Sequence, residues 1–172
     1  MTPKHRVFLG ALAVALPLDQ LSKWWISRTL GFTDEIPVLE GFFHLTHVRN
    51  PGAAFGILAT SPESVRVFFF VGVALFAIAL IISFFAKLAP GDRFSALSLG
   101  LILAGAVGNL IDRIRFGEVV DFLHFRLWGG YSWPDFNFAD SFIVVGVLLL
   151  VIELLASESE SREETQPARS ES

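Results

Sequence analysis

Long apolar runs separated by shorter polar segments are the main pattern of this chain. The four runs cover residues 7–26, 65–86, 94–112 and 138–156. Each is close to the ~20 residues that an α-helix needs to cross the hydrocarbon core of a bilayer. The pattern therefore predicts an all-α membrane protein with four transmembrane helices.

The first run begins like a secretory signal peptide, because basic residues precede an apolar core. A polar stretch and two tryptophans follow it instead of a small-residue cleavage site, so we expect an uncleaved helix with Trp24 and Trp25 at the far membrane interface. Asp19 and Lys23 lie four residues apart and share a helix face. We expect them either to pair with each other or to serve a nearby site.

The polar segments predict the extramembrane parts. Residues 27–64 contain β-prone pieces, such as residues 42–48, so two or three short strands are expected there. Residues 113–136 form a second extramembrane segment. Residues 157–172 are rich in Ser and Glu and are expected to be a disordered tail, which leaves residues 1–156 as one domain.

The four spans place both termini on the same side of the membrane. Residues 1–6 and 87–93 each hold two Lys or Arg residues in a very short segment, whereas the two long segments are less dense in them. By the positive-inside rule, both termini of this multi-pass protein are predicted to be cytoplasmic.

Composition supports a membrane protein and excludes several functions. Hydrophobic residues make up 53% of the chain and charged residues 17%, whereas soluble domains carry about a quarter charged residues. The net charge of −4 argues against a nucleic-acid partner. The absence of cysteine excludes disulfides and thiol catalysis. His44 and His47 alone are a weak metal signal, so we expect neither a metal nor another cofactor.

Polar residues that are scattered along the sequence are expected to collect at one depth. Helices one and three end at the outer face and helices two and four begin there, so the carboxylates and amides near those ends lie at the same level. A carboxylate in such a place is costly and is usually kept for function. The residues expected there are Asn50, Asn109, Asp112, Asp121, Asn137 and Asp140.

Two carboxylates that meet in an apolar setting share a proton, because they cannot both ionise readily. Such a pair can activate water for peptide hydrolysis, with one Asp taking a proton from water and the other donating to the carbonyl oxygen. The residues alone do not decide which two of Asp112, Asp121 and Asp140 form the pair.

The neighbouring residues suggest supporting contacts. Asn109 and Arg113 lie four residues apart and are expected to face the site as donors. Asn137 shares a helix face with Asp140 if the fourth helix already includes it. For Asp112, an ion pair with Arg113, Arg115 or Lys23 is expected, and the sequence does not choose among these partners.

Five blocks, taken together, resemble the lipoprotein signal peptidase (signal peptidase II) family. They occur in the family's order and with similar spacing, over about residues 7–155. The blocks are Asp19-Gln-Leu-Ser-Lys23, Asn50-Pro-Gly-Ala-Ala-Phe55, Gly105-Ala-Val-Gly-Asn109-Leu-Ile-Asp112-Arg113, Val119-Val-Asp121-Phe and Phe136-Asn137-Phe-Ala-Asp140-Ser141.

The resemblance implies an aspartic endopeptidase of the bacterial cytoplasmic membrane, with its active site near the outer face. Such enzymes remove the signal peptide of prolipoproteins before a diacylglyceryl-modified Cys, and a small extramembrane β-sheet cradles the substrate. Membrane lipid and lipid-modified prolipoproteins are then the expected partners, and a monomer is expected. The catalytic pair falls on Asp121 and Asp140. The expected substrate-binding or supporting residues are Asp19, Lys23, Asn50, Gly52, Asn109, Asp112, Arg113 and Asn137.

An ion- or proton-coupled transporter that uses the same carboxylates as a relay is the alternative from another class. Four spans are few for a transporter, and no inverted repeat is visible. The carboxylates also cluster at one end instead of forming a path across the membrane. His124, three residues after Asp121, is expected to be an interfacial histidine and not a catalytic partner.

Overall fold

The computed structural model describes residues 1–52 and 61–164, which form four helices and a four-stranded sheet. In chain order, the elements are α1 (Pro3–Thr29), β1 (Ile36–Leu39), β2 (Phe43–Asn50), α2 (Glu63–Lys87), α3 (Phe94–Phe116), β3 (Val119–Arg126), the 3₁₀ turn η1 (Trp128–Gly130), β4 (Ser132–Phe136) and α4 (Phe138–Glu164).

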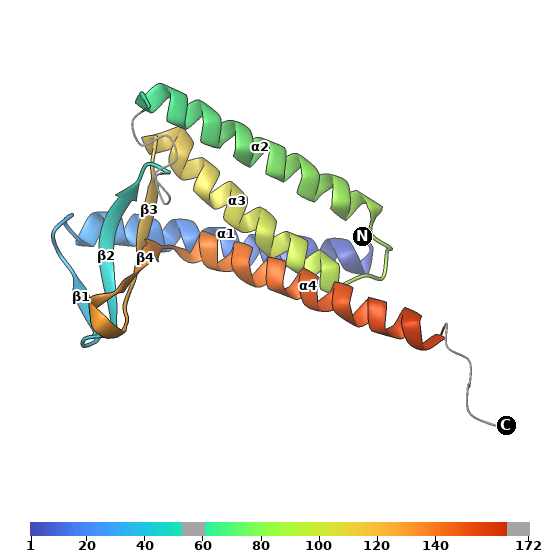
Figure 1. Ribbon diagram of the computed structural model, residues 1–172. Coiled ribbons are helices and arrows are strands. Elements are labelled where there is room, and N and C mark those ends of the chain that lie inside the picture. Colours follow the sequence, from blue (N-terminus) through green and yellow to red (C-terminus); the bar gives the residue numbers. More distant parts are fainter. Residues whose placement is uncertain (53–60, 165–172) are drawn as a thin grey trace.

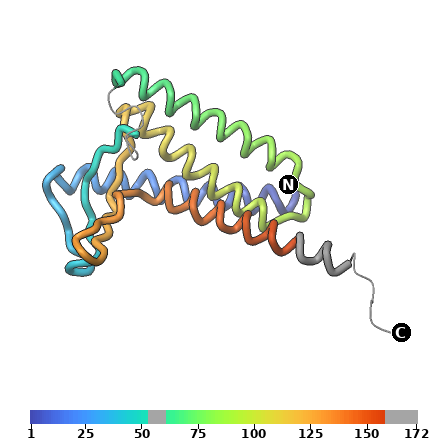
Figure 2. Tube along the Cα trace, in the orientation of Figure 1, coloured from blue at the N-terminus to red at the C-terminus, as the bar shows by residue number. Residues whose placement is uncertain are grey.

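Helix α3 is the centre of the bundle, since it contacts α1, α2 and α4. The sheet lies at one end of the bundle, where α1 and α3 end and α2 and α4 begin (Figure 1). The N-terminus and the connection from α2 to α3 lie at the opposite end, as the trace in Figure 2 also shows. Residues near the ends of distant helices are therefore brought to the sheet.

Three helices of the described residues are long and apolar enough to cross a membrane, namely α2, α3 and the Phe138–Ser157 part of α4. Helix α1 has a similar length but buries the charged residues Lys4, Asp19 and Lys23. Helix α1 packs along α3. Of the four spans expected from the sequence, three therefore have the length and composition of a membrane helix, and the first stays a prediction.

Helix boundaries extend beyond those expected from the sequence. Helix α1 begins at Pro3, since Pro suits the first turn of a helix. The buried Lys4 ammonium, in the same turn, donates to the carbonyls of Phe85, Ala86 and Leu88 at the end of α2, at 3.1, 3.4 and 2.7 Å. Helix α4 continues to Glu164, past the point where the sequence predicts the disordered tail to begin, and residues 165–172 lie outside the described part.

The sheet has the strand order β1-β2-β3-β4, with all neighbours antiparallel. The sequence predicts strands only in the first extramembrane segment, so β3 and β4 are a finding of the structure. Val120, Phe122 and Leu123 pack with Ile26 and Leu30 at the end of α1, which attaches the sheet to the bundle. Because side chains alternate along a strand, Asp121 points to the opposite face from Val120 and Phe122.

Small residues let α1 and α3 approach closely, as the Gly and Ala residues late in the third run suggest. A Cβ atom at Gly108 would collide with the carboxylate of Asp19, whereas one at Gly72, on α2, would meet no atom within 4 Å. The side chain of Asp19 therefore occupies the space that the missing Cβ leaves.

We expect Gly108→Ala to destabilise the protein. Overpacking against Asp19 should cost about 1–3 kcal/mol, more than the ~1 kcal/mol that Ala contributes to helix propensity. Thermal unfolding in detergent measures this, with Gly72→Ala as the matched control that should keep or raise the melting temperature. Equal melting temperatures for the two variants would contradict the close approach.

Candidate active site

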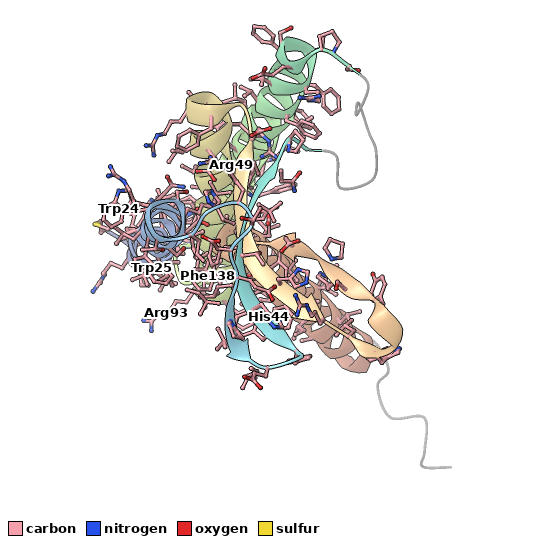
Figure 3. All side chains as sticks on the ribbon, turned by 90° about the vertical axis from the view of Figure 1, so that its left-hand side faces the viewer. Trp24, Trp25, His44, Arg49, Arg93 and Phe138 are labelled. Atoms are coloured by element: carbon pink, nitrogen blue, oxygen red, sulfur yellow. The ribbon has the colours of Figure 1, made fainter. Side chains whose placement is uncertain are left out.

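The residues that the sequence singles out meet at the sheet end of the bundle, although they come from five elements. Figure 3 views this end, with the end of α1 beside strands β2 and β3. Asp19 and Lys23 lie on α1, Asn50 ends β2, Asn109, Asp112 and Arg113 lie on α3, Asp121 lies on β3, and Asp140 lies on α4.

The buried ammonium group of Lys23 holds one half of the site together. It lies 3.0 Å from Asp19 Oδ2, 3.0 Å from Asp112 Oδ2 and 2.9 Å from Asn109 Oδ1. An ammonium has three protons, so all of its donors are used. The pairing of Asp19 with Lys23 is confirmed, and Lys23 is the partner of Asp112 that the sequence left open.

The carboxylates of Asp19 and Asp112 accept further hydrogen bonds. Asp19 Oδ1 accepts from the backbone N–H of Ala139 at 2.9 Å, and Asp112 Oδ2 accepts from that of Val120 at 3.2 Å. Gln20 donates to both carboxylates, at 3.1 and 3.3 Å. The sequence did not single out Gln20 as a site residue, although a polar residue within an apolar run is a signal for one.

Asn137 is the N-cap of α4 and forms a reciprocal pair of hydrogen bonds with Asp140. The backbone N–H of Asp140 donates to Asn137 Oδ1 at 3.0 Å, and that of Asn137 donates to Asp140 Oδ2 at 3.2 Å. This is the geometry of a capping box, formed by Asn and Asp. Asn137 thus precedes α4, and it contacts Asp140 through the cap and not through a shared helix face.

The same amide connects the two carboxyl groups that the sequence predicts as a pair. Asn137 Nδ2 donates to Asp121 Oδ1 at 2.6 Å and to Asn109 Oδ1 at 3.2 Å. Asn109 Nδ2 in turn donates to Asp140 Oδ1 at 2.7 Å. A continuous network of hydrogen bonds therefore runs from Lys23 through Asn109 to Asp140, and through Asn137 to Asp121.

Asn50 holds the other oxygen of Asp121. Its Nδ2 donates to Asp121 Oδ2 at 2.8 Å, and its Oδ1 accepts from the N–H of Gly52 at 2.9 Å, which orients the amide. Gly52 has φ 95° and packs against the ring of Phe70 where a Cβ would stand, so a side chain there is excluded. The rest of this predicted block, the close backbone approach at Ala53 and Ala54, lies outside the described residues.

Burial raises the pKa of Asp121, on β3, from 3.8 to about 7. The hydrogen bond from Asn50, the next largest influence, lowers this pKa, and the negative charge of Asp140 raises it further. The side chain is almost completely buried, with 1% of its surface exposed. A carboxyl group of this kind holds its proton near neutral pH.

Arg113 approaches the site as a charge and not as a hydrogen-bond donor to a named carboxylate. It interacts electrostatically with Asp140, Asp121 and Asp112. Its guanidinium lies 5.1 Å from the centroid of the Phe70 ring. Arg113 thus faces the site together with Asn109 as expected, but it acts there through its charge, whereas the sequence predicts a hydrogen-bond donor.

An apolar groove of about 660 Å³ leads to Asp140. It runs between β4 and the first turns of α4. Its lining residues are Trp133, Pro134, Asp135, Phe136, Asp140, Ser141, Val144 and Val145. The groove can therefore hold an apolar ligand beside the carboxylate of Asp140, which is part of its lining.

Two histidines near the site contact residues within or beside the sheet. His124 Nδ1 and Asp135 Oδ1 lie 3.0 Å apart, so His124 does not pair with Asp121. His47 Nδ1 lies 2.8 Å from the carbonyl oxygen of Leu30. Within residues 1–52 and 61–164, no group of three or more His, Cys, Asp or Glu side chains is arranged to hold a metal ion.

Comparison with known proteins agrees with this arrangement. The profile of the signal peptidase (SPase) II family matches residues 11–156. The chain belongs to the signal peptidase II family. It is 48% identical to the lipoprotein signal peptidase of Geobacter metallireducens, over 92% of this chain and 96% of that one. It is 45% identical to that of Syntrophus aciditrophicus, over 90% and 95% of the two chains.

Solved structures of the same fold are bacterial membrane enzymes determined by the in meso method. One, at 1.9 Å resolution, has a TM-score of 0.77 and 36% identity, covering 86% of this chain and 92% of that one. Another, at 2.3 Å, has a TM-score of 0.79 and 33% identity, covering 96% and 93%. As a member of the signal peptidase II family, the chain is a peptidase of membrane character.

Lys23→Met should destabilise the protein strongly. It leaves the buried carboxylates of Asp19 and Asp112 without their cation, which costs roughly 3–5 kcal/mol. Thermal unfolding in detergent tests this, with the exposed Lys87→Met as control, which should change stability by less than about 1 kcal/mol. A Lys23→Met variant as stable as that control would contradict the buried ion-pair cluster.

The raised pKa of Asp121 also predicts a pH-dependent stability. Because the folded state binds the proton more tightly than the unfolded state, this group contributes stability below about pH 4 that is lost as the pH rises to about 7. The loss is on the order of 4 kcal/mol. We expect Asp121→Asn to lack it, so the free energy of unfolding of the two proteins should converge at low pH and diverge towards neutral pH. Parallel profiles in denaturant titrations would refute a raised pKa.

Proposed function

We propose that this protein is an aspartic endopeptidase that cleaves the signal peptide from prolipoproteins before a diacylglyceryl-modified Cys, with Asp121 and Asp140 as the catalytic pair. Family membership and the names of the relatives, lipoprotein signal peptidases, support the substrate class. The site's hydrogen-bond network supports the assignment of the two carboxyl groups.

The main support for this proposal is that two of the four carboxylates pair with a cation and the other two do not. Asp19 and Asp112 each form an ion pair with Lys23. Asp121 and Asp140 form no ion pair among the described residues, and their hydrogen-bond donors are neutral amides. Their oxygens are thus positioned without being neutralised, which suits groups that must exchange protons.

The two carboxyl groups have different surroundings, which suits one group as an acid and the other as a base. Asp121 retains a proton near neutral pH, as its raised pKa indicates. Asp140 lies in the first turn of α4, where the helix N-terminus stabilises negative charge. We therefore assign Asp140 as the general base and Asp121 as the general acid.

In the first step, Asp140 takes a proton from water while the water oxygen bonds to the carbonyl carbon of the scissile peptide. Asp121 donates its proton to the carbonyl oxygen, which gives a tetrahedral gem-diol. In the second step, Asp140 returns its proton to the peptide nitrogen, the C–N bond breaks, and a diol hydroxyl proton passes back to Asp121. The products are a carboxyl and an amine terminus, and both Asp residues regain their first states.

The apolar groove beside Asp140 is suited to a lipid-modified peptide. Trp133 and Phe136 on one side and Val144 and Val145 on the other offer an apolar surface that ends at a reactive carboxyl. An acyl chain or an apolar signal-peptide segment in this groove would direct the modified Cys towards the Asp pair.

Helix α1 is proposed as the fourth membrane span of a domain that covers residues 1–156. Its polar residues Asp19 and Lys23 are buried against α3, while Val14 and Leu21 are among its exposed residues. Apolar side chains outside and polar ones inside suit a lipid environment. With four spans in the inner membrane, the dense Lys and Arg residues at the end opposite the sheet favour cytoplasmic termini and an outward-facing site.

Asp121→Asn and Asp140→Asn should each abolish cleavage, because each removes a proton acceptor or donor from the reaction. Loss of general acid–base catalysis alone would lower the rate by about 10²–10⁴-fold. The assay is cleavage of a diacylglyceryl-modified precursor by purified protein in detergent, with unfolding midpoints measured in parallel.

Asp34→Asn, at an exposed carboxylate that accepts from the N–H of Gly31, is the matched control and should retain full activity. Asp112→Asn should act mainly through stability, since Asp112 is bound to Lys23 and Val120. Wild-type turnover in either Asp121→Asn or Asp140→Asn would refute the pair. A folded but inactive Asp112→Asn protein would reassign one of its members.

A further inference from the structure

A second pocket lies behind the site, on the opposite face of β3. Val120 lines it, whereas Asp121, the next residue, points to the other face. The pocket has a volume of about 260 Å³ and lies between the ends of α1, α3 and β2. Figure 3 labels Trp24 and Arg49, which lie on α1 and β2 at its rim. The proposed reaction does not use this pocket.

Three arginines from three different elements line the pocket, and none forms an ion pair within the described part of the chain. Each lies over an aromatic ring. The Arg28 guanidinium is 5.9 Å from the Trp24 ring centroid, and those of Arg49 and Arg115 are 4.6 and 4.8 Å from the ring centroid of Phe116. Two positive charges thus share one ring without a counter-ion.

The charges around the pocket leave it positive. Asp112 is the acidic residue in its lining and pairs with Lys23, so the positive charges of the three arginines exceed the negative charge of the lining. The segment 53–60, which follows Arg49 closely in sequence, contains no acidic residue. Like charges held together in this way are unfavourable unless a ligand of opposite charge offsets them.

We propose that this pocket binds the phosphate group of an anionic phospholipid headgroup. Guanidinium groups recognise phosphate oxygens through paired N–H donors, and stacking on a ring orients the group while its N–H edge stays free. The exposed indole of Trp24 and the ends of two helices place the pocket at the depth of lipid headgroups. The helix ends here are C-terminal, so the arginines must supply the donors that a helix N-terminus would otherwise offer.

A bound headgroup would also tie the pocket to the site. Arg49 immediately precedes Asn50, which donates to Asp121. A phosphate shared by Arg49 and Arg115 would hold the end of β2 against the end of α3. We therefore expect lipid binding to stabilise the fold as well as to occupy the pocket.

The test is lipid binding by the full-length protein in detergent, followed by native mass spectrometry and thermal unfolding. The probes are phosphatidylglycerol, phosphatidylcholine and soluble glycerol phosphate. Wild-type protein should retain phosphatidylglycerol in preference to phosphatidylcholine and unfold at a higher temperature with it. Glycerol phosphate should compete weakly, because it offers the phosphate without the membrane-bound chains.

Arg49→Gln with Arg115→Gln should weaken phosphatidylglycerol binding about 25-fold, at about fivefold per arginine.

Arg66→Gln is the matched control, since Arg66 lies in the first turn of α2 at the same end of the bundle but outside the pocket. It should bind phosphatidylglycerol like wild type. If the double Gln variant does not fold, Arg49→Lys with Arg115→Lys keeps both charges and should still lose affinity, because lysine cannot form the paired contacts.

Three outcomes would overturn the proposal. Equal retention of the two phospholipids would show that the pocket does not select an anionic headgroup. Equal weakening in Arg66→Gln would mean that general surface charge attracts the lipid. Binding of glycerol phosphate without phosphatidylglycerol would make the ligand a free phosphate. None of these measurements depends on cleavage activity, so they stay distinct from the test of the Asp pair.

Discussion

The side chain of Asn137 is the contact on which the site depends. Its oxygen caps α4, and its two N–H groups reach Asp121 and Asn109. Because the side chain is fully buried, none of these bonds can be replaced by bulk water without cost. The start of a membrane helix and the geometry of the carboxyl pair are therefore set by one amide, and neither can change without the other.

Lys23 acts on the same network from the opposite side. A buried ammonium between two carboxylates is costly to desolvate and is tolerated because all three protons are used. Its third contact fixes the amide of Asn109 with the oxygen towards Lys23 and the nitrogen towards Asp140. A charge that takes no part in the proposed reaction thus decides which way the neutral donors of the site point.

The sequence predicted what depends on local spacing, and it could not predict what depends on packing. The pair Asp19–Lys23 follows from a four-residue interval on a helix. The choice of Lys23 over two nearby arginines for Asp112 depends on how α1 packs against α3, which no local pattern contains. Whether Asn137 belongs to the fourth helix was left open, although Asn followed three residues later by Asp is the spacing of a capping box and could have identified it as a cap. The strands β3 and β4 were missed because an apolar stretch such as residues 119–123 does not reveal its partner strand.

The contact between Lys4 and the end of α2 has a consequence for how the bundle survives in lipid. Three backbone carbonyls at the end of α2, which have no partner within that helix, are satisfied by one ammonium from the first turn of α1. Lys4, in the basic segment before the first apolar run, therefore holds the end of a neighbouring helix in place. Fusions or truncations at this terminus should accordingly be judged by whether they leave the contacts of Lys4 intact.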